Sequence, residues 1–392
     1  MEMITTADAL ERLAARLLGA EAIAVDTEFF WERTYWPILG LVQIADADTC
    51  WLIDTVRLTD ISALGPVLTA PSVIKILHDA PQDLGILARA TGAAPRNVFD
   101  TRLAAGFAGF SSTCSLQALL RDALGIELSK AETRSDWLRR PLREAQLRYA
   151  ADDVAYLVRV RETLLSRCAS DTVRAWLAEE LARLDEPSLY GDRDPRLMYQ
   201  RVKGGSRLTA RQFAVLRELA AWRESAAKER DWPRGHVLPD TVLVDVAQAS
   251  PTDHAALAAV PEFPRRMPEE IADQLLEAVA AGLAVPNGEC PRPPDFDLAA
   301  KRASKARCDQ LLERIKAACA PFGIDPALVA SRADAESYVQ AQAQDTVDAP
   351  LLAQGWRGLL GIAMPDKGGA GKRDAVHGLP LFDAAAETLG MR

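Results

Sequence analysis

Short apolar runs in the first third of the chain predict buried strands. They lie at Ala22–Thr27, Leu39–Ala45 and Val73–Leu77, and a His-Asp-Ala-Pro sequence typical of the start of a helix follows the third run. Beyond residue 115 leucines recur at helical spacing, most regularly from Leu147 to Leu165. Strands followed by interleaved and terminal helices predict an α/β domain with a mixed sheet.

Two stretches that contain proline and glycine divide the rest of the chain. Residues 186–206 and 285–295 lack a helical pattern and are typical of connectors. Apolar residues at helical spacing lie between them, as from Phe213 to Trp222, and again beyond the second stretch. We predict three domains: an α/β domain at residues 1–190 and all-α domains at residues 207–283 and 296–392.

Composition narrows the class of protein. The chain has 392 residues, of which 49% are hydrophobic and 26% charged, the balance of a globular protein of two or three domains. No apolar run approaches the roughly 18 residues of a membrane span. The acidic N-terminus does not resemble a signal peptide. The six cysteines form no Cys-x-x-Cys pair, so we expect reduced thiols and a cytoplasmic location.

Charge gives two opposing indications about nucleic-acid binding. The net charge of −9 argues against a nucleic-acid partner, because phosphate contacts need Lys and Arg. Between Arg193 and Arg234, however, 11 basic residues exceed 5 acidic ones. This stretch is compatible with a binding surface and equally with a solvated helix face.

Asp26 and Glu28 lie at the end of the first predicted strand. Residues two apart in a strand point to the same face about 6.6 Å apart, so both carboxylates project together. Asp83 falls in the first turn of the helix after the third strand, where the helix dipole favours any acid. Tyr149 and Asp153 are four residues apart and share a helix face. Each feature alone is common in proteins without a site.

The four acids together indicate a site more clearly than any one of them does alone. If they converge, two carboxylates about 4 Å apart repel by roughly 4 kcal/mol at an effective dielectric constant near 20. Divalent cations such as Mg²⁺ prefer carboxylate oxygens and neutralise such a cluster. Two ions about 4 Å apart can contact both the attacking and the leaving oxygen of a phosphodiester. The set therefore predicts metal-dependent hydrolysis without a covalent nucleophile.

Three motifs resemble those of the DEDD exonucleases: Asp26-Thr27-Glu28-Phe29, His78-Asp79-Ala80-x-x-Asp83-Leu84 and Tyr149-x-x-x-Asp153. The tyrosine indicates the tyrosine-bearing branch. Within it, the stretches at residues 33–43, 99–101 and 132–142 resemble the ribonuclease D family, and the match covers roughly residues 20–165. The resemblance implies a ribonuclease H-like fold and a 3′→5′ exoribonuclease that trims tRNA precursors and releases nucleoside 5′-monophosphates. It also implies a monomer without a membrane partner.

The resemblance assigns roles to five residues. Asp26 would bridge two Mg²⁺ or Mn²⁺ ions, Glu28 and Asp153 would complete the site of the attacking water, and Asp83 would support the second ion. Tyr149 would orient the water, since an ordinary tyrosine pKa near 10 makes deprotonation costly at neutral pH.

Two further residues are candidates for substrate contact. Phe29 could stack on a terminal base, although core packing is as plausible. His78 could contact substrate, although a structural hydrogen bond is an alternative at the end of a strand.

The segment from about Leu208 to Gly282 resembles the HRDC domain, a helical nucleic-acid-binding module, through the pattern of residues 216–231. Residues 311–338 resemble a diverged second copy more loosely, so the resemblance implies two HRDC-type domains that grip structured RNA. Alternative functions are a DNA-directed 3′→5′ exonuclease, which the four acids cannot separate from an RNA enzyme, and a non-catalytic RNA-binding protein. A carboxylate-pair glycosidase finds little support in where the acids lie.

Overall fold

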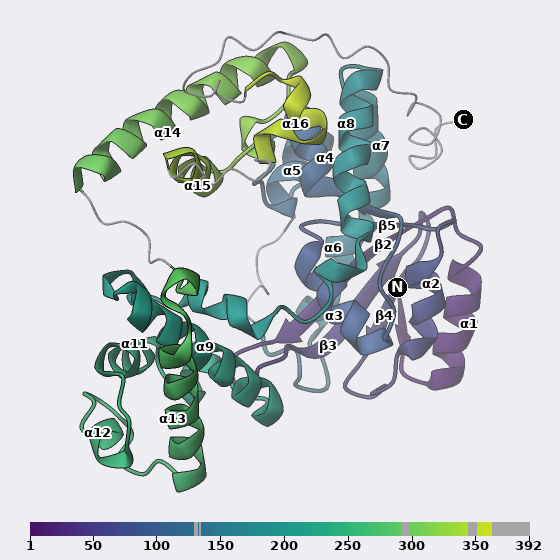
Figure 1. The fold of residues 1–392 in the computed structure, drawn as a ribbon. Helices are drawn as coiled ribbons and strands as arrows, with labels where there is room; N and C mark the ends of the chain where they lie inside the picture. The colour runs from purple at the N-terminus through teal and green to yellow at the C-terminus, as the bar shows by residue number, and fades with distance from the viewer. Residues whose placement is uncertain (129–131, 133–134, 292–297, 344–350, 363–392) are drawn as a thin grey trace. The chain divides into compact units, whose positions relative to one another are not determined.

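The computed structural model describes the chain except residues 129–131, 133–134, 292–297, 344–350 and 363–392 (Figure 1). It contains two compact units. Unit 1 comprises Met1–Phe29, Leu39–Gly191 and Arg302–Arg392, and unit 2 comprises Phe30–Ile38 and Asp192–Lys301. Within the described part of the chain, the structure shows no helix that is both long and apolar enough to cross a membrane.

Unit 1 is built on a six-stranded mixed sheet in the order β1-β4-β3-β2-β5-β6. β3 and β4 pair antiparallel, whereas β1 pairs parallel with β4 and β5 pairs parallel with both β2 and β6. The strands are β1 (Glu2–Ile4), β2 (Ala22–Phe30), β3 (Ile38–Ala45), β4 (Cys50–Asp54), β5 (Ile74–Leu77) and β6 (Val98–Asp100).

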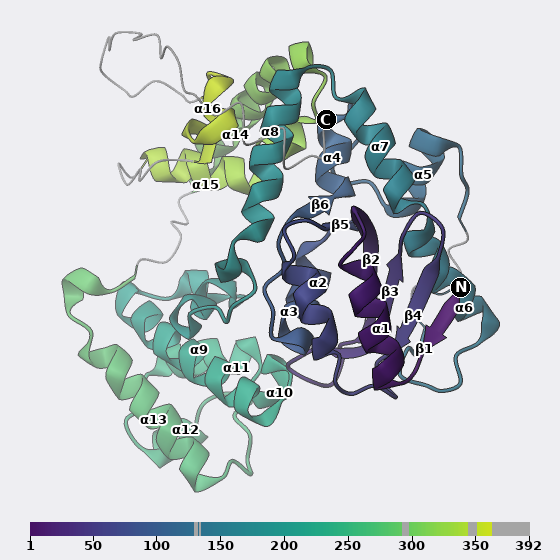
Figure 2. The ribbon, with the colours of Figure 1, turned by 90° about the vertical axis from the view of Figure 1, so that its right-hand side faces the viewer.

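Helices cover the sheet, and Figure 2 shows α1, α2 and α3 over one face. Side chains alternate along β3 and divide between two cores. Val42 and Ile44 join the main core, whereas Leu41 packs with Trp137 and Ala150 in a smaller one. The helices of this part are α1 (Ala7–Leu17), α2 (Gly65–Thr69), α3 (Pro81–Thr91), α4 (Thr101–Phe107), α5 (Leu116–Leu124), α6 (Glu144–Ala155), α7 (Leu157–Arg167) and α8 (Asp171–Ala182).

The C-terminal helices α14 (Leu298–Cys319), α15 (Arg332–Ala343) and α16 (Gly355–Leu359) contribute to the core of unit 1. Trp356 is fully buried and stacks on Trp176 of α8 at a centroid distance of 5.6 Å. Arg357 donates to Glu180 of α8 at 2.6 and 3.1 Å. The described residues from Arg302 onward therefore share the core of unit 1, where they pack against α4 and α8. A second HRDC-type domain there stays a prediction, and residues 296–297, 344–350 and 363–392 lie outside the described residues.

Unit 2 is helical, with one core formed chiefly by α9 and its neighbours. Thr209 caps α9 by accepting from the Gln212 nitrogen, and the Gln212 side chain accepts from the Thr209 nitrogen in return. The Tyr35 hydroxyl donates to Glu224, which also pairs with Arg234. The helices are α9 (Ala210–Arg230), α10 (Arg234–Val237), α11 (Asp240–Ala249), α12 (His254–Ala258) and α13 (Glu269–Ala284).

The three strands predicted from apolar runs are confirmed as β2, β3 and β5. The sequence analysis missed β1, β4 and β6, of which β1 and β6 have only three residues each. Short strands owe their position to pairing with neighbours, so local pattern indicates them poorly. The long helical pattern from Leu147 to Leu165 is two helices, because α6 ends at Ala155 and α7 begins at Leu157.

Candidate active site

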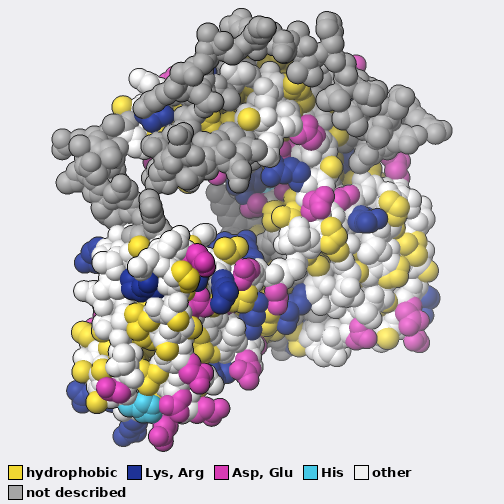
Figure 3. All heavy atoms as spheres, in the orientation of Figure 1, with side chains coloured by type: hydrophobic (Ala, Val, Ile, Leu, Met, Phe, Trp, Pro, Cys, Tyr) yellow, Lys and Arg dark blue, Asp and Glu magenta, His cyan; other side chains and the backbone are white. Residues whose placement is uncertain are grey.

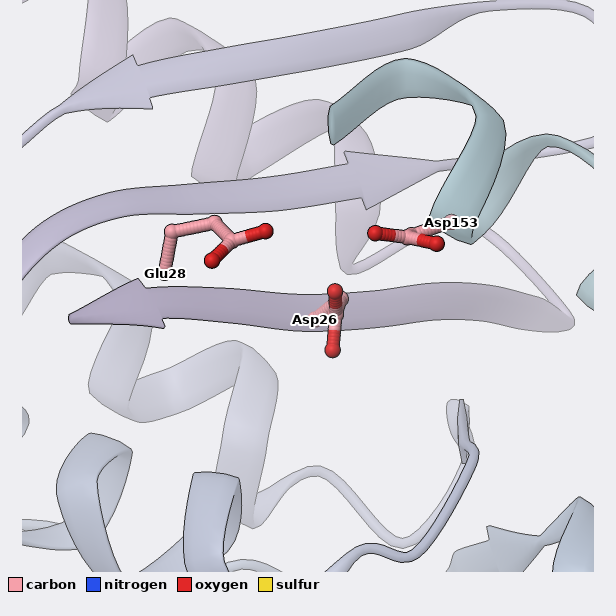
Figure 4. A group of neighbouring side chains, drawn as sticks. All are labelled: Asp26, Glu28 and Asp153. Carbon is pink, nitrogen blue, oxygen red and sulfur yellow. The ribbon is translucent and has the colours of Figure 1, made fainter. Parts of the chain in front are cut away.

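Three carboxylates from two elements of unit 1 meet beside the sheet. Asp26 and Glu28 project from β2 and Asp153 projects from α6, and each offers an oxygen within 4.8 Å of the other two (Figure 4). Asp26 and Glu28 share a face because they are two apart in a strand. The predicted convergence of these three acids is therefore observed, across more than one hundred residues of sequence.

The position of α6 depends on packing around Trp137. This side chain is 2% exposed and packs with Leu41, Leu52 and Ala150. Its ring also lies 6.2 Å, centroid to centroid, from that of Tyr149. The contact places Tyr149 and Asp153, one helical turn apart, beside the strand that carries the other acids.

A partly buried arginine fixes the segment that supplies Trp137. Arg140 donates to both carboxylate oxygens of Asp54 at 2.8 Å each, and it also donates to the carbonyl oxygens of Gly40 and Trp137. A side chain at Gly40 would collide with the Trp137 carbonyl, so this close approach requires glycine. The sequence analysis assigned no role to Arg140 or Asp54, although Arg140 falls in the matched stretch 132–142. Thr133 and Arg134 of that stretch lie outside the described residues.

Burial and mutual repulsion raise the pKa values of the clustered acids. Burial is the larger cause for Glu28, followed by the charges of Asp153 and Asp83, and raises its pKa to about 9. Burial, then Asp83, Asp153 and Glu28, raises the pKa of Asp26 well above 3.8. Burial raises the pKa of Asp153 to about 7, although a hydrogen bond from Tyr149 acts in the opposite direction. Such a cluster is unfavourable as anions unless cations neutralise it.

Asp83 lies near the other acids but outside their closest group. It is in the first turn of α3, where it accepts a hydrogen bond from the Thr27 hydroxyl. Its charge raises the pKa values of Asp26 and Glu28, which indicates proximity to both. Burial raises its own pKa to about 6, while the bond from Thr27 lowers it. The role of Thr27 was missed because a threonine between two acids carries no separate signal.

A cavity of about 400 Å³ adjoins the acids. Asp26, Tyr149 and Asp153 line it, so the cluster is accessible from this space. The remaining lining comes from the turn after β5, from α4 and α7, and from the start of α5 with the segment that leads into it: His78, Asp79, Arg102, Thr113, Cys114, Ser115, Leu116, Gln117 and Leu157. Polar groups with hydrogen-bonding capacity predominate, which suits a polar substrate.

His78 lines the cavity, but both of its ring nitrogens have partners in the protein. Nδ1 lies 2.9 Å from the Thr101 hydroxyl and Nε2 lies 3.1 Å from the Cys114 carbonyl oxygen. Burial lowers its pKa. These contacts favour the structural alternative for His78. Phe29 is half-buried and is not among the described residues that line this cavity, so substrate contact by either residue stays a prediction.

Asp100 holds the turn between β5 and α3. Its carboxylate accepts from three backbone nitrogens: those of Asp79 at 3.2 Å, Ala80 at 2.9 Å and, at the start of α4, Arg102 at 2.7 Å. Asp79 has a φ of +65°, a left-handed backbone conformation that residues other than glycine rarely adopt and that these bonds stabilise. Asp100 lies in the stretch 99–101 that resembles the family, but nothing in the sequence indicated this role.

About half of the basic residues in the stretch 193–234 are engaged in ion pairs within unit 2. Figure 3 shows Lys and Arg interspersed with Asp and Glu on the visible face. Five of the 11 basic residues pair with acids: Arg196, Arg217, Arg223, Lys228 and Arg234. A solvated, internally paired surface therefore accounts for about half of the stretch.

Comparisons with known proteins agree with this architecture. A 3′-5′ exonuclease family model matches residues 1–169, and an HRDC domain model matches residues 212–279. The second match falls inside the predicted domain at 207–283.

Among similar proteins, ribonuclease D of Desulfotalea psychrophila is 40% identical over 356 residues, which is 91% of this chain and 95% of that protein. Ribonuclease D of Pseudomonas paraeruginosa is 42% identical over 269 residues, or 69% of this chain and 71% of that protein. The crystal structure of Escherichia coli RNase D, described as an exoribonuclease involved in structured RNA processing, matches with a TM-score of 0.79 at 31% identity. The match covers 91% of this chain and 95% of that one. The chain therefore belongs to the ribonuclease D family of 3′→5′ exoribonucleases.

Proposed function

We propose that this enzyme removes nucleotides one at a time from the 3′ ends of RNA, including tRNA precursors, by hydrolysis that depends on two divalent cations, Mg²⁺ or Mn²⁺. The observation that carries the proposal is the group of Asp26, Glu28 and Asp153, whose oxygens lie within 4.8 Å of one another. The relation to RNase D of Escherichia coli, which is involved in structured RNA processing, supports RNA as substrate.

The donor set fits hard divalent cations. Burial raises the pKa values of all three carboxylates, and the neighbouring acids raise those of Asp26 and Glu28 further, which is an arrangement that a cation stabilises. Asp26, Glu28 and Asp153 would hold the ions, and Asp83 would support the second. When bound, such ions polarise the scissile phosphodiester and lower the pKa of water.

The protein's own groups position the reactants. Tyr149 donates a hydrogen bond to Asp153, lines the cavity and is held beside Trp137, so its hydroxyl can orient a water molecule at the acids. The water oxygen bonds to phosphorus while the bond to the 3′ oxygen of the preceding nucleotide breaks. The last nucleotide then leaves as a 5′-monophosphate, and the shortened RNA keeps a 3′ hydroxyl.

Unit 2 is proposed to bind structured RNA. The HRDC match supports this role, and Arg201, Lys203 and Arg207 have exposed side chains near the start of α9. Exposed cations contact phosphates without reading sequence. Replacing all three by Gln should raise KM on a 3′-extended tRNA precursor more than on a short oligonucleotide. Equal effects on both substrates would argue against this role.

The central experiment is digestion of a 3′-extended tRNA precursor with Mg²⁺, with Mn²⁺ and with EDTA, with products resolved to one nucleotide. We expect stepwise shortening with either metal and none with EDTA. Asp26→Asn and Asp153→Asn should abolish nucleotide release, whereas Asp152→Asn, a neighbouring carboxylate outside the cluster, should not. Wild-type release by Asp26→Asn would refute the assignment. Faster digestion of DNA than of RNA of the same sequence would favour the DNA alternative. The monomeric state and the cytoplasmic location stay predictions.

A further inference from the structure

The segment between α4 and α5 forms part of the wall of the active-site cavity. Thr113, Cys114 and Ser115 line the same space as Asp26 and Asp153. Thr113 and Ser115 are exposed, so their hydroxyl groups can meet a bound nucleotide. Between Ser111 and Cys114 the segment has no regular secondary structure and forms a turn, in which the nitrogens of Thr113 and Cys114 donate to Ser111. Contacts from outside the segment add to this turn and hold it in place.

One of these contacts comes from the connection between α14 and α15. Oδ2 of Asp325 accepts from the Ser112 nitrogen at 2.6 Å and from the Ser112 hydroxyl at 2.9 Å. The Asp325 nitrogen in turn donates to the Gly106 carbonyl oxygen at 2.8 Å. Ser112 and Asp325 are 213 residues apart, and both belong to unit 1.

The packing around this contact leaves little room for another arrangement. Asp325 caps the short 3₁₀ helix Pro326–Leu328, so its own position is fixed by the Ala327 nitrogen at 3.0 Å. A Cβ at Gly106 would lie 2.7 Å from Leu328 and 2.8 Å from the Ser112 Cβ. Glycine at this position therefore permits the C-terminal segment and Ser112 to meet on α4.

The contact continues from Ser112 to cavity-lining side chains. The Ser112 carbonyl oxygen accepts from Nε of Arg102 at 2.8 Å, and Arg102 forms an ion pair with Asp79. Nε2 of His78 lies 3.1 Å from the Cys114 carbonyl oxygen. Arg102 and His78 thus hold the segment from one side and Asp325 holds it from the other.

We propose that Asp325 is a positioning residue for substrate: through Ser112 it fixes segment 111–115 as a wall of the cavity that receives the 3′-terminal nucleotides of RNA. A wall that is ordered before binding does not have to be ordered by the substrate, so the contact lowers KM. Asp325 is remote from the reacting atoms, so kcat is unaffected. The inference rests on the proposed function only in taking this cavity as the substrate site.

The test measures kcat and KM with Mg²⁺ on a single-stranded RNA of about ten nucleotides, which isolates the cavity from binding elsewhere. For Asp325→Ala we expect KM to rise about tenfold, equivalent to about 1.4 kcal/mol, with kcat within about twofold of wild type. Ser112→Ala keeps the backbone donor and should raise KM less. The double variant Asp325→Ala/Ser112→Ala should have the KM of Asp325→Ala alone, because Asp325→Ala already removes the hydroxyl bond that Ser112→Ala would remove.

Asp334→Ala is the matched control. Asp334 lies in the same C-terminal segment and accepts the same pair of bonds, from the nitrogen of Ser331 at 2.8 Å and its hydroxyl at 2.6 Å. It should leave KM unchanged. The proposal is overturned if Asp325→Ala leaves KM unchanged, if it lowers kcat alone, or if Asp334→Ala raises KM equally.

Two other outcomes are possible: the variant does not fold, or the wild-type protein is inactive. If Asp325→Ala does not fold, Asp325→Asn and Ser112→Ala decide, with an increase in KM supporting the proposal and an unchanged KM overturning it. If wild type releases no nucleotide from the RNA, the proposed function fails. If wild type is active and the variants behave like it, only this inference fails.

Discussion

Replacing Glu28 by Gln should stabilise the metal-free protein while inactivating it. Glu28 has a pKa of about 9 in the folded chain against an ordinary 4.5, chiefly because of burial and then because of Asp153 and Asp83. Because the folded pKa is the higher one, the favourable contribution of the protonated group is complete below pH 4.5. It is lost as pH rises towards 9.

The size of the effect follows from the same values. At pH 7 the Glu28 carboxyl of the unfolded chain is ionised. In the folded chain it must either stay protonated or carry a negative charge that Asp153 and Asp83 repel. Keeping Glu28 protonated costs about 1.4 kcal/mol of folding free energy for each pH unit above 4.5, which amounts to about 3 kcal/mol at pH 7. Glu28 is partly exposed, and solvent screening reduces the cost. We expect Glu28→Gln to raise the free energy of unfolding by about 1 to 3 kcal/mol. Each kcal/mol corresponds to a rise of roughly 2–4 °C in the melting midpoint.

The assay is thermal unfolding of wild type, Glu28→Gln and Glu11→Gln in EDTA between pH 4.5 and 8. Glu11 is an exposed acid on α1 and controls for the loss of one carboxylate. The advantage of Glu28→Gln should be absent near pH 4.5 and should grow with pH. Mg²⁺ should stabilise wild type more than this variant, because only wild type has the full donor set. The reasoning is wrong if Glu28→Gln has no higher midpoint than Glu11→Gln at pH 8 in EDTA.

Three other predictions concern different parts of the chain. Tyr149→Phe should lower kcat about 100-fold with little change in KM, because water positioning acts in the transition state; single-turnover RNA cleavage measures this. Arg357→Ala should destabilise unit 1 by about 3 kcal/mol, because it removes the buried guanidinium that pairs with Glu180 and leaves this carboxylate only Trp356 and the more exposed Arg183 as partners; denaturant unfolding followed by tryptophan fluorescence reports the loss. Gly282→Ala should destabilise unit 2 by at least about 1–3 kcal/mol, since its Cβ would lie 2.8 Å from the Val215 nitrogen; an unchanged unfolding midpoint would contradict the packing described.

The sequence determined those features that depend on neighbouring residues. Apolar runs predicted β2, β3 and β5, and the spacing of Asp26 and Glu28 predicted that they share a face. Helical spacing predicted the helical regions beyond residue 115 without the bounds of most helices in them, and motif order identified the acids and Tyr149 as candidates. These features were accessible because strand alternation and helix periodicity are local properties of a chain.

Only the tertiary structure decided how distant parts meet. The packing of Trp137 against β3 and β4 brings Asp153 to Asp26, and the buried pair of Arg357 and Glu180 joins α16 to α8 across 177 residues. Neither the contact of Asp325 with Ser112 nor the shared core of the C-terminal helices has a local signal. Such contacts are selected by burial and by the pairing of polar groups in the complete fold, so no short stretch of sequence specifies them.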